Sequence, residues 1–223
     1  NQPKAMIPLK DKSILEHISD TYRNHGINKI HVVRGYKKES INFPELNYID
    51  NDDHETTSEL SSFHKAIDQI SGDIVCSFGD VLFKPYLLQL LDECEDDLVI
   101  VVDTQWKDSV NRDRAADYVN CSQPHSRANY GDSIFLESAG ENLGEDSIHG
   151  EWMGIIKISS AIFPTVRKEV ESLSKLENFD SMKMHHLLEH LCRLKQPIRV
   201  VYTTGNWLDV DTLEDVIRAN NFL

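Results

Sequence analysis

The chain is poor in cysteine and in basic residues, and it has no long apolar run. Its four cysteines stand far apart along the 223 residues, without a CxxC pair. We therefore predict reduced cysteines that serve in packing, as is usual in the cytoplasm. No apolar run approaches the roughly 20 residues that cross a bilayer, so a membrane-spanning helix is not expected. The cysteines are Cys76, Cys94, Cys121 and Cys192.

Basic residues are outnumbered, since 23 Lys and Arg stand against 37 Asp and Glu, for a formal net charge of -14 at pH 7. A broad surface for nucleic acid or anionic membrane needs clustered cations, so such partners are not expected. Apolar residues make up 40% and charged residues 27% of the chain. This composition is that of a globular protein with a covered core, and we predict a single domain over residues 1–223.

Apolar periodicity predicts alternating helices and strands, the pattern of an α/β fold. Ser13 and Glu16 form a capping-box pattern at the start of the first helix, and Thr212 is a candidate cap of the last. The polar segment 104–150 is interpreted as an antiparallel insertion that covers a substrate. Helices are predicted at 13–24, 56–70, 161–173, 182–194 and 212–219 and from Pro85 onward, and strands at 29–33, 48–49, 73–78, 98–102, 118–119, 133–136, 152–158 and 198–202.

The segment 73–83, with the sequence DIVCSFGDVLF, is the stretch around which the chain is organised. Its first residues are mostly small, apolar or aromatic, which predicts a strand buried on both faces, as in a parallel sheet. Gly79 ends the run, and Asp80 follows at the carboxyl end of the strand, the edge where open α/β sheets bind ligands. The alternative is that Gly79 and Asp80 are ordinary turn residues.

A second acidic cluster, WLDVD, stands at 207–211. Asp80 with Asp209 and Asp211 would form a set of carboxylates from separate strand ends, which is how proteins hold Mg²⁺ against a substrate phosphate. The alternative is that Asp209 and Asp211 only precede and cap the last helix. Lys4 is either a solvated surface charge or a point-charge contact to a phosphate.

Five further side chains are candidates for binding roles. Arg112, Arg114 and Arg127 are the few cations of the insertion, and they are either solvated or positioned to hold an anionic acceptor. His186 and His190 stand four residues apart, close to a zinc-ligand spacing, but without the HExxH pattern or an evident third ligand.

Two sets of short motifs run along the chain. The first set is PKAMIPL at 3–9 and VVRGYK at 32–37, and the second is GDVLF at 79–83, VVD at 101–103, DYVNCS at 117–122, GEWMG at 150–154 and WLDVDTLED at 207–215. The first set resembles the sugar-phosphate and choline-phosphate nucleotidyltransferases. The second resembles one branch, the cytidylyltransferase domain that accompanies phosphoenolpyruvate mutase in phosphonate biosynthesis, and together they cover nearly the whole chain. That family begins with a strand and a Gly-rich loop for the nucleoside triphosphate, which we expect to precede Asn1.

The resemblance implies a three-layer α/β/α fold with a Rossmann-like, mostly parallel sheet of the glycosyltransferase-A-like type. It implies a cytidylyltransferase that moves CMP from CTP to 2-aminoethylphosphonate or 2-hydroxyethylphosphonate and releases pyrophosphate. Mg²⁺ would be the cofactor, and phosphoenolpyruvate mutase would be a fused or cooperating partner. The alternatives are choline-phosphate or sugar-phosphate nucleotidyl transfer, or an inert nucleotide-binding domain.

The same resemblance assigns roles to individual residues. Lys4 matches the family's lysine near the phosphates, and Asp80 with Asp209 or Asp211 would carry Mg²⁺ on the α-phosphate. Thr57, Ser58 and Gly79 match segments that border the nucleotide, and Arg112, Arg127, Glu151 and Trp152 are expected to bind the acceptor.

Overall fold

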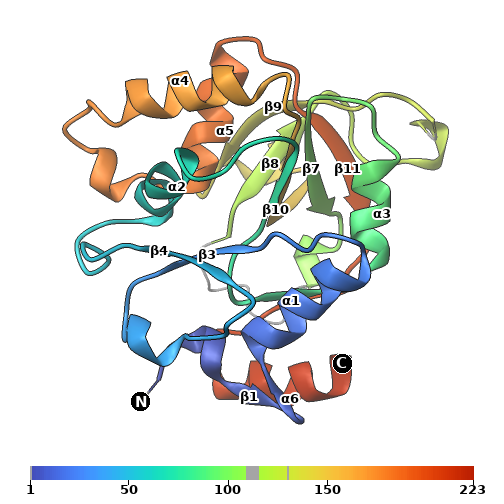
Figure 1. The fold of residues 1–223 in the computed structure, drawn as a ribbon. Coiled ribbons are helices and arrows are strands. Elements are labelled where there is room, and N and C mark those ends of the chain that lie inside the picture. Colours follow the sequence, from blue (N-terminus) through green and yellow to red (C-terminus); the bar gives the residue numbers. More distant parts are fainter. Residues whose placement is uncertain (1, 109–115, 130) are drawn as a thin grey trace.

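The computed structural model describes residues 2–108, 116–129 and 131–223, and a mixed sheet lies at its centre (Figure 1). The strands of this sheet are β5 Ile74–Cys76, β7 Leu98–Asp103, β8 Tyr118–Cys121, β9 Leu136–Gly140, β10 Gly150–Ile158 and β11 Arg199–Thr203. They stand in the order β11-β7-β10-β8-β9, and β5 also pairs with β10. The β11–β7 pair is parallel, and the other pairs of this sheet are antiparallel.

Three two-stranded pairs flank the main sheet. Their strands are β1 Pro8–Leu9 and β2 Lys12–Ser13, β3 His31–Arg34 and β4 Asn47–Asp50, and β6 Val81–Phe83 and β12 Trp207–Asp209. The β3–β4 pair is parallel, whereas β1–β2 and β6–β12 are antiparallel. The last pair joins two segments far apart in the sequence, and it carries the acidic residues of interest.

Helices cover both faces of the main sheet, so the predicted three-layer α/β fold is confirmed. The helices are α1 Ile14–Asn24, α2 Glu59–Ile67, α3 Tyr86–Asp92, α4 Phe163–Leu173, α5 Met184–Arg193 and α6 Leu213–Phe222. Apolar residues of α2, α4 and α5 form one core with the sheet, and those of α1, α3 and α6 share a second core. None of the helices in the described part of the chain is both long and apolar enough to span a bilayer.

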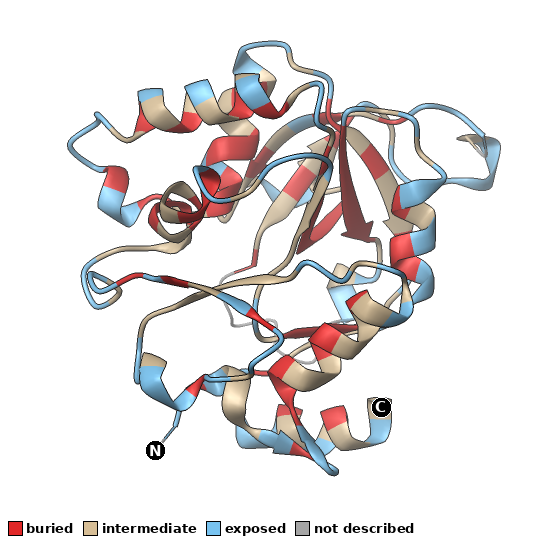
Figure 2. Cartoon of the chain, in the orientation of Figure 1, coloured by how far each residue is buried: buried red, intermediate tan, exposed pale blue. Residues whose placement is uncertain are grey.

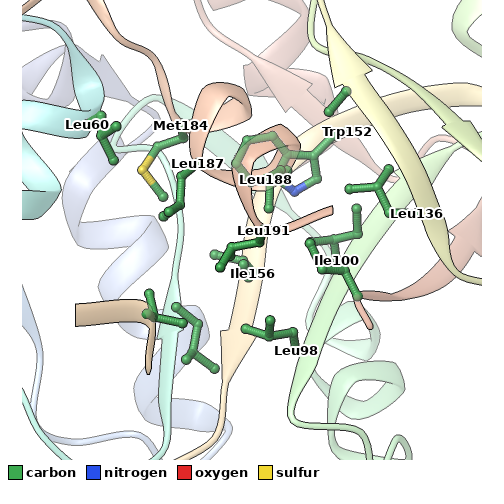
Figure 3. Packing of buried hydrophobic residues seen from close by; sticks show 14 of the residues in the cluster. Leu60, Leu98, Ile100, Leu136, Trp152, Ile156, Met184, Leu187, Leu188 and Leu191 are labelled. Atoms are coloured by element: carbon green, nitrogen blue, oxygen red, sulfur yellow. The ribbon is translucent and has the colours of Figure 1, made fainter. Parts of the chain in front are cut away.

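Strand β7 shows how the sequence builds these two cores. Every residue of β7 is buried (Figure 2), and alternate side chains of a strand point to opposite faces. Leu98 and Ile100 accordingly pack in the core with α2, α4 and α5 (Figure 3), whereas Val99 and Val101 lie in the other core. The prediction of a doubly buried strand at 98–102 is confirmed.

The capping residues seen in the sequence correctly predicted where the first and last helices begin. Ser13 Oγ accepts a hydrogen bond from the backbone of Glu16, whose carboxylate accepts from the backbone of Ser13, which completes the predicted capping box of α1. Thr212 and Asp215 form the same arrangement at the start of α6. All four cysteines are free, as expected.

The prediction for the segment 73–83 was wrong in detail. Its first part, β5, is only half-buried and pairs antiparallel with β10 rather than within a parallel sheet. Asp80 lies immediately before the fully buried β6, not at the carboxyl end of one continuous strand. The apolar residues on either side of Gly79 belong to strands of two different sheets, which a continuous apolar run cannot reveal. In the insertion, β9 begins at Leu136 instead of covering 133–136.

Candidate active site

The antiparallel pair β6–β12 brings the predicted carboxylates together. Asp209 faces Val81 in the register of this pair, and the backbone N–H of Val210 donates a 3.1 Å hydrogen bond to the carbonyl of Asp80. One carboxylate oxygen from each of Asp80, Asp209 and Asp211 lies within 4.8 Å of the other two. We call these three residues the acidic triad.

Lys4 places its ammonium group at the acidic triad. It lies on the 3-10 helix η1 Lys4–Met6, and its Nζ contacts Asp211 and lies 3.4 Å from Asp80 Oδ2. Burial on its own would lower the pKa of Lys4, but the hydrogen bond to Asp211 and the charges of Asp80, Asp211 and Asp209 together raise it above the usual 10.5. Lys4 is therefore a fixed positive charge at neutral pH.

The donor set of the acidic triad fits a hard divalent cation. Its three carboxylates and the Lys4 ammonium carry a formal net charge of minus two, so a divalent cation would neutralise the group. Carboxylate oxygens are the ligands that Mg²⁺ prefers, and sulfur or imidazole is absent from the triad. Gly79 is exposed, and a Cβ built on it would meet nothing within 4 Å, so the backbone beside Asp80 is accessible.

The segment that precedes α2, expected to border the nucleotide base, is organised by Asn51. Asn51 is 2% exposed, and its side-chain amide donates 3.1 Å hydrogen bonds to Thr57 Oγ1 and Ser62 Oγ. The Thr57 hydroxyl in turn donates to the carbonyl of Asp53. Ser58 is the N-cap of α2, yet its side chain makes no capping hydrogen bond. The Thr57 hydroxyl is thus engaged within the loop, whereas that of Ser58 is not used as a cap.

Glu151 and Trp152 lie on β10, beside the end of β7. Glu151 is 3% exposed and stands between Asp103 and Tyr118 in the register of the neighbouring strands. Trp152 is 2% exposed, its indole N–H donates to the carbonyl of Ile155 over 2.9 Å, and it belongs to the core (Figure 3). Trp152 thus packs in the core, and its contact with the acceptor stays a prediction.

Arg127 is the arginine of the insertion that lies within the described residues. Arg127 is exposed on the 3-10 helix η4 Arg127–Asn129, in a loop that packs against β11. The hydrogen bond from Arg199, the first residue of β11, to the carbonyl of Asp132 holds this loop at the start of that strand. Arg112 and Arg114 lie outside the described residues.

A second group with possible metal ligands comprises Asp117, Glu141 and His185. Its members already pair with one another or with a neighbouring cation. His185 Nδ1 lies 2.7 Å from Asp117 Oδ1, and Lys183 Nζ contacts Glu141. The group is therefore a charge network between α5 and the β8–β9 region of the sheet.

The two histidines with zinc-like spacing do not converge. The backbone N–H of Lys183 donates to His186 Nδ1 over 3.0 Å, and His190 Nε2 lies 2.9 Å from Glu169 Oε2. Sequence reasoning also missed the pairing of His185 with Asp117 and the organising role of Asn51. The available signal was weak, since Asn51 stands within the polar run 50–54, and the pairing of His185 with Asp117 joins residues 68 positions apart.

Comparison with known proteins shows which family model and which relatives the chain matches. Residues 1–177 match the family model of the MobA-like NTP transferase domain. The chain is 25% identical over 232 residues to a CTP:phosphoglutamine cytidylyltransferase of Campylobacter jejuni, covering 97% of this chain and 90% of that protein. It is 23% identical over 228 residues to the bifunctional protein GlmU of Methanocaldococcus jannaschii, of which it spans 50%.

A more local match joins the chain to a CMP-5'-(3-aminopropyl)phosphonate synthase of Streptomyces rubellomurinus. The two are 26% identical over 98 residues, which cover 40% of this chain and 16% of that protein. Among solved structures, the inositol-1-phosphate CTP transferase from T. maritima superposes with a TM-score of 0.76 at 15% identity, covering 99% of this chain and 87% of that one. That superposition confirms the nucleotidyltransferase fold predicted from the sequence.

Proposed function

The chain belongs to the MobA-like NTP transferase family and is a nucleotidyltransferase, and on that premise we propose that it transfers CMP from CTP to a small phosphonate. The choice of CTP is supported by the cytidylyltransferase relative, which matches nearly the whole chain. The choice of a phosphonate is supported by the aminopropylphosphonate synthase relative. The acceptor would be 2-aminoethylphosphonate or 2-hydroxyethylphosphonate, supplied by chemistry that begins with phosphoenolpyruvate mutase.

The proposed reaction is an in-line displacement at phosphorus. A phosphonate oxygen of the acceptor attacks the α-phosphorus of CTP and forms a new P–O bond. The bond between the α-phosphorus and the oxygen that bridges to the β-phosphate breaks, and the leaving group is pyrophosphate. Negative charge spreads over the phosphoryl oxygens in such transition states, so catalysis depends on positioning and on positive charge near them.

The observation that carries the proposal is the meeting of Lys4 with the acidic triad. Lys4 offers a permanent positive charge that can offset charge on the phosphates, because its pKa is held above 10.5. Asp80, Asp209 and Asp211 would hold Mg²⁺, which when bound would neutralise further phosphate charge. Thr57, Ser58 and Gly79 remain candidates for contact with the nucleotide, and Glu151 and Arg127 for contact with the acceptor.

A phosphorylated amide is the second candidate acceptor. The phosphoglutamine cytidylyltransferase relative matches the chain over nearly its full length, unlike the phosphonate synthase. Phosphoglutamine and the phosphonates share the group that reacts, a terminal anionic phosphorus with free oxygens. The same site chemistry therefore serves either acceptor, and substrate tests must separate them.

The test is a matrix of pyrophosphate-release assays on the full-length protein with Mg²⁺. CTP, UTP, ATP and GTP are each combined with the two phosphonates, phosphoglutamine, phosphocholine and glucose 1-phosphate. Release confined to CTP with a phosphonate supports the proposal, and release confined to CTP with phosphoglutamine selects the second candidate. Release with UTP and a sugar phosphate, or silence throughout from folded protein, contradicts it.

A further inference from the structure

Asp103 carries a buried carboxylate that has no part in the proposed reaction. It is the last residue of β7 and is 7% exposed. Its Oδ1 accepts hydrogen bonds of 2.9 Å from the backbone N–H groups of Gln105 and Gly205. Its Oδ2 accepts a 2.8 Å hydrogen bond from the indole N–H of Trp207. Three donors from two separate loops thus converge on one carboxylate.

Two of these donors belong to Gly205, in the connection from β11 to β12, and to Trp207, the first residue of β12. Gly205 and Asn206 both have positive φ, 63° and 66°, so the chain makes a tight left-handed turn there. Trp207, the next residue, begins β12, which ends at Asp209 of the acidic triad. Asp103 therefore binds the turn through Gly205 and the first residue of β12 through Trp207.

The position of β12 decides whether the acidic triad can form. Among the described strands β12 pairs with β6 alone, so β12 is joined to the main sheet by the turn at Gly205 and by side-chain contacts such as that of Trp207 rather than by a strand ladder. Asp80 immediately precedes β6, and Asp211 follows β12 by two residues. A shift of β12 against β6 would therefore separate Asp209 and Asp211 from Asp80 and open the triad.

We propose that Asp103 is a positioning residue for the divalent-cation site, acting through Trp207 and Gly205 on strand β12. The inference rests on the proposed function, since it requires that the acidic triad bind a cation. Asp103 is not itself part of the triad, and its carboxylate is engaged by the three donors named above. Partners that orient metal ligands from outside the first coordination sphere typically change metal affinity by about 10- to 100-fold when replaced.

The hydrogen-bond chemistry identifies a discriminating variant. In Asp103→Asn, the remaining carbonyl oxygen can still accept from the two backbone N–H groups. The new amide N–H₂ then faces the indole N–H of Trp207, so two donors meet where a donor and an acceptor stood. Trp207→Phe removes the indole donor, and in the double variant that clash is absent. The two substitutions are therefore expected to couple rather than add.

The experiment measures Mn²⁺ binding directly, by electron paramagnetic resonance of free Mn²⁺ with the full-length protein and no nucleotide. The variants are Asp103→Asn, Trp207→Phe and the double variant. The matched control is Asp97→Asn, which changes an exposed carboxylate just before the other end of β7. The carboxylate of Asp97 accepts a hydrogen bond from the Ser159 hydroxyl, and the side-chain carbonyl of asparagine can accept the same hydrogen bond in the variant. Thermal unfolding of each variant is recorded in parallel.

We expect Asp103→Asn to weaken Mn²⁺ binding about tenfold, with the double variant no weaker than Asp103→Asn and the Asp97 control unchanged. Wild-type Mn²⁺ affinity in Asp103→Asn, or full additivity of the two substitutions, would overturn the positioning role while leaving the metal site in place. If Asp103→Asn fails to fold, Trp207→Phe decides, because wild-type affinity there also overturns the role. Absence of Mn²⁺ binding by the wild type would overturn both the inference and the metal part of the proposed function.

Discussion

Lys4 Nζ contacts the carboxylate of Asp211 across 207 positions of the sequence. The contact joins the start of the chain to the segment between β12 and α6, and Asp80 lies within 3.4 Å of the same ammonium. The lysine and a divalent cation would both be attracted to these carboxylates. Lys4 therefore has two opposed effects, competition with the cation in the free enzyme and stabilisation of phosphate charge during turnover.

Lys4→Met separates those two effects. Loss of the ammonium should leave Mn²⁺ binding to the free enzyme as tight as in the wild type or tighter, because a competing positive charge is gone. Turnover should fall by about 10²- to 10³-fold, the usual cost of removing one group that stabilises transition-state charge. The matched control is Lys12→Met, which removes an exposed ion pair with Asp20. Weaker Mn²⁺ binding together with unchanged turnover in Lys4→Met would contradict both assignments.

Asp80→Asn should abolish turnover while the protein still folds. The substitution removes one anionic ligand from the acidic triad, but Asp80 is partly exposed and its backbone contact to Val210 is retained. We expect a change in melting temperature of no more than a few degrees, with no measurable pyrophosphate release. Asp92→Asn is the control, since it changes an exposed carboxylate that pairs with His25. An active Asp80→Asn variant with Mg²⁺ would exclude Asp80 as a metal ligand.

Gly154→Ala should be strongly destabilising. Gly154 has φ of 79°, and an added Cβ would lie 2.2 Å from Cδ2 of the Phe78 ring. The residue lies where the register between β10 and β7 shifts, so the strand cannot readily move to relieve the clash. Backbone strain and overpacking together predict a loss of about 3 kcal/mol or more in the free energy of unfolding.

Gly140→Ala provides the comparison for that measurement. Gly140 is also in a strand, but a Cβ there would meet nothing within 4 Å. Urea denaturation should place this variant within about 0.5 kcal/mol of the wild type. Equal effects at the two glycines would show that the Phe78 contact and the positive φ are not what Gly154 provides.

Glu16→Gln should remove a pH-dependent part of the stability. Hydrogen bonds from the backbone and side chain of Ser13 hold the pKa of Glu16 below its usual 4.5. A lowered native pKa means that the stabilisation is present above pH 4.5 and is lost as the pH falls through the native value. The wild type should therefore exceed Glu16→Gln by about 0.5–1 kcal/mol at pH 7, and the difference should shrink toward pH 3. Glu39→Gln, an exposed carboxylate of the 3-10 helix η2 Lys38–Ser40, is the control.

The parts of the fold predicted from sequence are those governed by local signals. Ser13 with Glu16 and Thr212 mark helix starts because capping depends on residues three positions apart. The apolar run 98–102 predicts a buried strand because every one of its side chains is covered. The run 73–83 misled because it contains two strands that pair with different partners, and pairing is decided by distant segments.

The candidate site shows the same difference between features set by local sequence and features set by distant segments. Asp80, Asp209 and Asp211 could be nominated because acidic residues beside apolar runs are visible in the sequence. The role of Asp103 could not, because it depends on a turn at Gly205 that folds back from more than a hundred residues away. Trp152 was assigned to the acceptor from the resemblance that includes GEWMG at 150–154, and its burial in the core depends on the helices that cover β10.

The central claim is the transfer of CMP to a small phosphonate, and phosphorus-31 NMR of the product tests it most directly. The full-length protein is incubated with CTP, Mg²⁺ and 2-aminoethylphosphonate, with Asp80→Asn as the inactive control. The account predicts pyrophosphate and a pair of mutually coupled resonances, one from the phosphonate phosphorus and one from CMP, joined by a P–O–P bond. CTP hydrolysis to CMP with the phosphonate unchanged, or no reaction from folded enzyme with this acceptor or 2-hydroxyethylphosphonate, would contradict it.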